Sequence, residues 1–124
     1  MTNATPATQP DSEAVRSLAE TIIAGTLEAE RVLMKARRNA TPAARAHIDG
    51  EIGAIEAQRQ RVRAELIRFE AQIMVFRPPD PAEMARVEAL IGELANLTAA
   101  SILAARGLQI TTELIQIWSR TRTG

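Results

Sequence analysis

The chain has 124 residues, with 15 Lys plus Arg balanced by 15 Asp plus Glu. This balance provides no overall electric field that would attract nucleic acid or an anionic membrane. Aromatic residues make up only 2% of the chain and cysteine is absent, which excludes disulfides, thiolate nucleophiles and cysteine-based metal sites. The apolar residues are mainly Ala, Ile and Leu, so we expect one all-α domain.

The first ten residues, MTNATPATQP, lack the cationic start and the apolar run of a signal peptide. We therefore expect residues 1–10 to form a disordered tail and the protein to be cytoplasmic. A first helix is predicted over about 11–39, because Asp11 can accept hydrogen bonds from the amides of a first turn. Asn39 can adopt the left-handed conformation that ends a helix.

A second helix is predicted over about 42–76, where Thr41 supplies an N-cap and Pro42 occupies the first helical position. An uninterrupted series of three- and four-residue steps runs through it: Ile48, Ile52, Ile55, Arg59, Val62, Leu66, Phe69, Ile73 and Phe76. This spacing is typical of a long helix that packs against others along its length. Arg59 is its only polar member, so it either reaches solvent at the edge of the seam or fixes the register by pairing with an acid.

The Arg77-Pro78-Pro79 sequence ends the second helix, and Asp80, Pro81 and Glu83 form a capping box that starts a third. This third helix is predicted over about 81–119, followed by a short C-terminal tail at 121–124. Two short connections make neighbouring helices antiparallel. We therefore expect one all-α domain over 11–120, with three long helices in an antiparallel up-down-up bundle and coiled-coil-like packing.

Candidate chemical groups are few. His47 is the only histidine and Asp49 and Glu51 follow it, but a ferritin-like metal site needs Glu-x-x-His and position 44 is alanine. We interpret this cluster as a solvated first turn. No Ser-His-Asp arrangement, glycine-rich phosphate loop or inward pair of carboxylates can be assembled. We therefore expect no enzyme activity, no metal and no cofactor.

The third predicted helix is apolar around more of its circumference than two shorter neighbours can cover. We therefore expect self-association as a homodimer, with Trp118 as the anchor. The predicted interface comprises Arg59, Val62, Leu66, Phe69, Ile73, Leu103, Ile110, Leu114, Ile117 and Trp118.

These features predict a helical protein–protein interaction module, such as an adaptor, scaffold or chaperone-like subunit, whose partner is another helical protein. Two alternatives remain open. One is a membrane-active helical protein, since small residues favour close helix packing in bilayers. The other is phosphate or nucleic-acid docking at a basic pole, which an up-down-up bundle would form from Lys35, Arg37, Arg38, Arg45, Arg120 and Arg122.

Overall fold

The computed structural model describes residues 5–97 and 101–123, with side chains described for 11–97 and 106–123. The described chain contains four helices: α1 (Thr5–Arg38), α2 (Pro42–Glu70), α3 (Pro81–Ala95) and α4 (Ser101–Arg120). The prediction of an all-α fold is confirmed. The prediction of three helices is wrong, because the third predicted helix is divided into α3 and α4.

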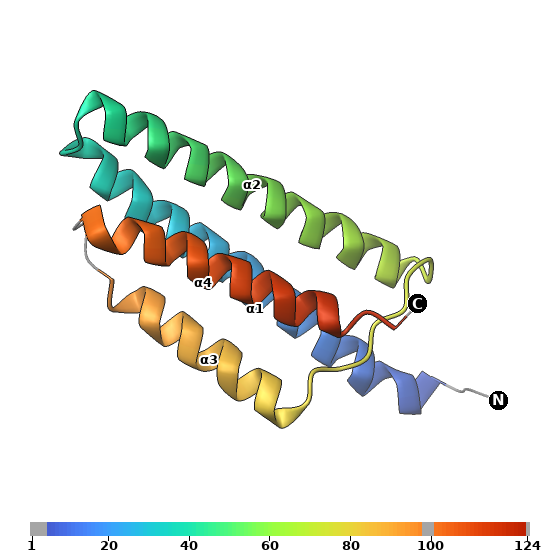
Figure 1. Cartoon of the computed structure of the whole chain (residues 1–124). Helices are drawn as coiled ribbons and strands as arrows, with labels where there is room; N and C mark the ends of the chain where they lie inside the picture. Colours follow the sequence, from blue (N-terminus) through green and yellow to red (C-terminus); the bar gives the residue numbers. More distant parts are fainter. Residues whose placement is uncertain (1–4, 98–100, 124) are drawn as a thin grey trace.

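Successive helices run in opposite directions, so α2 and α4 point the same way (Figure 1). α1 and α4 lie between the two outer helices, α2 and α3. Within the described ranges, α2 packs against α1 and α4 and makes no contact with α3. This arrangement leaves the side of α2 that faces away from the bundle without a neighbour.

α1 is longer than predicted, since it begins at Thr5 rather than near residue 11. Residues 1–4 of the predicted tail lie outside the described residues. The predicted turn to α2 is confirmed, with Thr41 Oγ1 accepting a hydrogen bond from Ala44 N at 3.2 Å. Ion pairs then join α1 and α2 along their length: Arg37–Asp49 at 2.7 Å, Arg59–Glu30 at 3.2 Å and Arg16–Glu70 at 2.7 Å.

α2 ends at Glu70, earlier than the predicted end at residue 76. Gln72 adopts a left-handed conformation with φ 63°, and its N–H donates to Phe69 O at 3.0 Å. The N–H of Ile73 donates to Arg68 O at 2.7 Å. These two bonds form a Schellman motif. The sequence did not predict this end, because the C′ position, which is usually glycine, is Gln72.

The segment after α2 is extended and pairs with the C-terminus. Arg77 N donates to Thr121 O at 2.7 Å and Thr123 N donates to Val75 O at 2.9 Å. The residues predicted as a C-terminal tail, as far as Thr123, therefore lie against the connection between α2 and α3 (Figure 1).

α3 begins with the capping box that the sequence predicts. Glu83 N donates to Asp80 Oδ1 at 2.7 Å, and Asp80 N donates to Glu83 Oε1 at 3.0 Å. α3 ends at Ala95, where Asn96 forms the C-cap. Two cross-helix ion pairs then bind α3 to α4, Arg86–Glu113 and Arg106–Glu93. Because the two pairs share the same midpoint in the sequence, they align α3 and α4 as an antiparallel hairpin.

The core runs between the helices and ends in a cluster of the chain's three aromatic side chains. Trp118 stacks on Phe76 with ring centroids 4.3 Å apart. Phe69 meets Phe76 edge to face at 5.9 Å. This cluster secures the extended segment against the end of α4.

Candidate functional site: the outer face of α2

Most of the residues predicted to form an interface lie inside the bundle. Five of them are buried in the core: Val62, Ile110, Leu114, Ile117 and Trp118. Leu66 and Phe69 are partly buried, and Ile73 is 73% exposed. The side chain of Leu103 lies outside the described residues. The α4 residues are buried because α4 packs against α1, α2 and α3, and α3 folds back over a side of α4 that a single long helix would expose.

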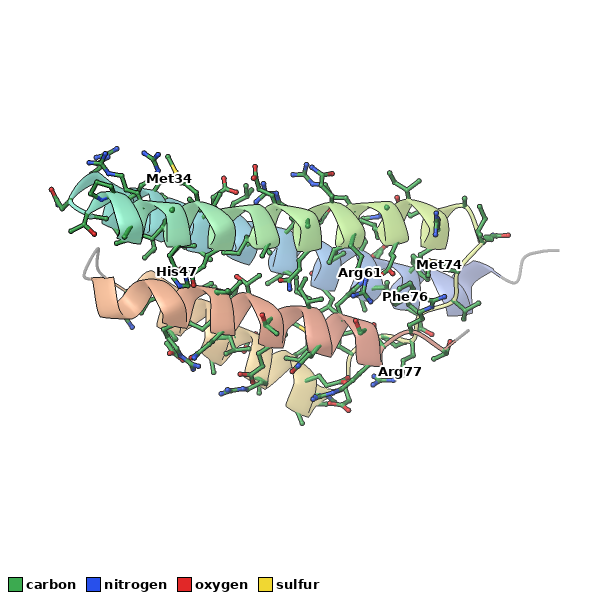
Figure 2. The ribbon with its side chains drawn as sticks, turned by 45° about the horizontal axis from the view of Figure 1, so that its top comes forward. Met34, His47, Arg61, Met74, Phe76 and Arg77 are labelled. Carbon is green, nitrogen blue, oxygen red and sulfur yellow. The ribbon has the colours of Figure 1, made fainter. Side chains whose placement is uncertain are left out.

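Trp118 is fully buried, so its side chain offers no surface to a second molecule in this fold. Its Nε1–H donates to Glu65 Oε1 at 2.8 Å, which satisfies the polar edge of the indole. Arg61 reaches from α2 toward the end of α4 (Figure 2), pairs with Glu65 at 3.3 Å and donates to Ser119 Oγ at 3.0 Å. This network holds α2 and α4 together.

Arg59 is buried, which excludes the alternative in which it reaches solvent and leaves the alternative in which it pairs with an acid. Both Nη atoms lie 3.2 Å from Glu30 Oε1 on α1. The pair therefore fixes the α1–α2 register within one chain.

The predicted basic pole is divided between the two ends of the bundle. At the α1–α2 turn, Arg37 pairs with Asp49, which lowers the pKa of that carboxyl, and Arg45 Nε donates to Arg37 O at 3.3 Å. Lys35 and Arg38 are exposed near this turn. Arg120 and Arg122 lie at the opposite end, because α4 runs back toward the start of α1 (Figure 1). The division follows from the same break between α3 and α4.

His47 is 77% exposed, and its Nε2 lies 3.7 Å from Glu51 Oε1. Within the part of the chain that the structure describes, no group of three or more His, Asp or Glu side chains is placed to hold a metal ion. In the same residues, no helix is both long and apolar enough to cross a membrane.

A pocket of about 310 Å³ lies beside the end of α2. Its apolar lining comes from Phe69, Met74 and Val75, while the Arg16–Glu70 ion pair closes one side. It is open to solvent at Val75, which is 58% exposed. The pocket holds no arrangement of groups that suggests a reaction.

An unpartnered apolar surface lies on the side of α2 that faces away from α1 and α4. We call it the outer face. Its nine positions follow three- and four-residue steps and all are exposed: Ala43, Ala46, Gly50, Gly53, Ala57, Gln60, Ala64, Ile67 and Ala71. Gln60 is the only polar member. α2 is therefore apolar on two opposite sides, one of which the described part of the chain leaves uncovered.

Two observations show that the outer face is open. A Cβ atom added at Gly50 or Gly53 would have no described atom within 4 Å apart from the local helix backbone. Ile67 is 66% exposed and is the one large apolar side chain on the face. Glycine within a helix costs about 0.5–1 kcal/mol relative to alanine, and no contact within the described chain uses the space that Gly50 and Gly53 leave.

Charged residues border the outer face along both edges, with Asp49, Glu56, Arg63 and Glu70 on one edge and Arg61 and Arg68 on the other. Asp49 and Glu70 are already paired with arginines of α1. Glu56 is 55% exposed and lies 4.0 Å from Arg59, at the limit of an ion pair. Arg63 is exposed and has no ion pair or hydrogen bond with another described side chain. The middle of the first edge thus carries one acid, Glu56, and one base, Arg63, that have little or no ion pairing inside the described chain.

The three- and four-residue spacing of the outer face can be read from the sequence. It forms a second seam on α2, offset from the inner seam that begins at Ile48. Small residues are poor indicators on their own, and only the structure shows which side is uncovered.

No protein-family model matches the chain, and no curated protein or solved structure is significantly similar to it.

Proposed function

We propose that this protein is a non-enzymatic helical interaction module that binds a helix of another polypeptide on the outer face of α2. The observation that carries the proposal is an exposed, nearly unbroken apolar seam along a helix of 29 residues. Such a helix is about 43 Å long at 1.5 Å per residue. Amphipathic helices commonly bind along grooves and seams of this kind.

The chemistry of the face suits a helix. Alanine and glycine allow two helix backbones to approach closely, toward the lower end of the usual 8–10 Å separation. Ile67 supplies an apolar side chain that a partner can bury, and burying one such side chain contributes about 1.5–3 kcal/mol. The flanking charges then select the partner's orientation.

The test is site-specific photo-crosslinking in cells that express the chain. A photoreactive amino acid replaces Ala57 at the centre of the outer face, and a matched variant carries it at Ala89, which is exposed on α3. We expect protein adducts from position 57 and few from position 89. Equal labelling at both positions, or no protein adduct at position 57, would contradict the proposed function.

A further inference from the structure

We infer that the helix bound on the outer face is α2 of a second copy of this chain, packed antiparallel in a single register. The inference rests on the proposed function, because it names the partner of the same surface. It is carried by the exposed Ile67 and by the placement of charge beside the seam; the small residues only permit the close approach.

Shape complementarity is met when the two-fold axis passes between Gln58 and Arg59. Ile67 of each copy then faces Gly50 of the other, so the largest side chain of the face enters the space beside a glycine. In the same register Ala64 faces Gly53. An isologous contact of this kind uses one surface twice and closes at the dimer.

Charge complementarity selects the same register. In an antiparallel helix pair, residues along one edge of the seam in the first helix face residues along the same edge in the second helix. Glu56 of each copy then faces Arg63 of the other, which forms two ion pairs. Asp49 faces Glu70 at the two ends, but Arg37 and Arg16 already neutralise these carboxylates within each chain.

The neighbouring registers are unfavourable. A shift of seven residues in one direction brings the two copies of Glu56 together; it also places Arg63 opposite Asp49, which Arg37 already neutralises. A shift in the other direction brings together the two copies of Arg63. A parallel pair would instead place Arg63 beside Arg68 of the second copy, which is a like-charge contact. It would also place Glu56 beside Arg61, but Arg61 already pairs with Glu65 and donates to Ser119 within its own chain. Like charges across an interface disfavour the arrangement that contains them.

The first test reverses charge at the centre of the seam and measures the dimer dissociation constant by sedimentation. We expect Arg63→Glu to weaken the dimer about tenfold, because both ion pairs become repulsive. The double variant Glu56→Arg/Arg63→Glu is expected to restore wild-type affinity. Tighter association of Arg63→Glu, as a parallel pair predicts, would overturn the inference, and so would an unchanged dissociation constant.

The second test uses the absence of native cysteine. Gly53→Cys and Ala64→Cys chains are mixed and oxidised, and we expect the mixed disulfide, since these positions face each other. Two copies of position 53 are about 16 Å apart along the antiparallel axis, too far for a disulfide. Disulfides mainly between identical variants would overturn the inference.

The outcomes separate the inference from the proposed function. A chain that stays monomeric at about 100 μM while position 57 crosslinks to a different protein overturns the second copy as partner and leaves the interaction module intact. Absence of any protein adduct at position 57 overturns both. Thermal unfolding of each variant, followed by circular dichroism, confirms that the monomer fold is retained.

Discussion

Gln72 is a residue whose backbone departs from what its side chain favours. Its φ of 63° lies in the left-handed region, which costs a residue with a Cβ about 1–2 kcal/mol relative to glycine. Two hydrogen bonds of the Schellman motif, from the N–H groups of Gln72 and Ile73, hold it there.

We therefore expect Gln72→Gly to stabilise the fold. The relief of strain exceeds the added entropy of the unfolded chain, leaving a gain of about 0.5–1 kcal/mol. Urea unfolding measures this, with Gln72→Ala as a control that keeps the strain and should show no gain. A loss of stability in the glycine variant would show that the turn is held by the glutamine side chain instead.

Glu83 is the residue that most clearly couples stability to pH. Two hydrogen bonds from the Arg77 guanidinium, at 2.7 and 2.8 Å, lower the pKa of Glu83 to about 2, with help from the Asp80 backbone N–H. The unfolded chain has a glutamate pKa of about 4.3. Since the folded pKa is the lower one, this stabilisation is complete above about pH 4.3 and is lost as pH falls toward 2.

We expect Glu83→Gln to lower the unfolding free energy at pH 7 by about 1–2 kcal/mol, through loss of the ion pair and of part of the capping box. At pH 2 the variant and the wild type should have nearly equal stability. Chemical unfolding at both pH values measures the difference. A deficit of the same size at pH 2 would mean that the charge of Glu83 contributes nothing.

For the helices, the sequence predicted the starts of α2 and α3 and the ends of α1 and α4, but it missed the start of α1 and the break between α3 and α4. Thr41 and Asp80 cap α2 and α3 as expected, because capping depends on a few adjacent residues. The break after Ala95 has no proline or glycine to mark it. The ion pairs Arg86–Glu113 and Arg106–Glu93 accompany this break, but they cannot be recognised in the sequence before α3 and α4 are known to lie side by side.

The close packing of α1 against α3 and α4 gives an element-scale prediction. A Cβ at Gly25 would lie 2.6 Å from Ile91 Cδ1 and 3.0 Å from Leu114 Cδ1. We expect Gly25→Leu to destabilise the bundle by about 1–3 kcal/mol through overpacking. Gly92→Leu on the open side of α3 is the matched control and should cost nothing. Thermal and urea unfolding compare them, and equal effects would contradict the close approach at Gly25.

At the scale of the whole molecule, the sequence indicated an apolar excess but not its location. Both seams of α2 follow helical spacing, and periodicity alone does not show which seam another helix covers. The larger side chains of the inner seam, such as Ile55 and Val62, are buried within the chain. Trp118 was predicted to anchor an interface because its side chain is large and apolar, and the same property accounts for its burial in the core. The remaining candidate surface consists of smaller residues and became visible only after the helices were placed.

Sedimentation equilibrium is the decisive test of whether a second copy of the chain occupies the outer face of α2. At about 100 μM, the wild type should sediment at twice its monomer mass of 13.5 kDa. Gly50→Gln should be a folded monomer, because the larger side chain blocks Ile67 of the second copy while favouring the helix. Gly92→Gln on α3 should remain a dimer. A wild type that stays at 13.5 kDa, or a Gly50→Gln variant that associates as tightly as Gly92→Gln, would contradict the account.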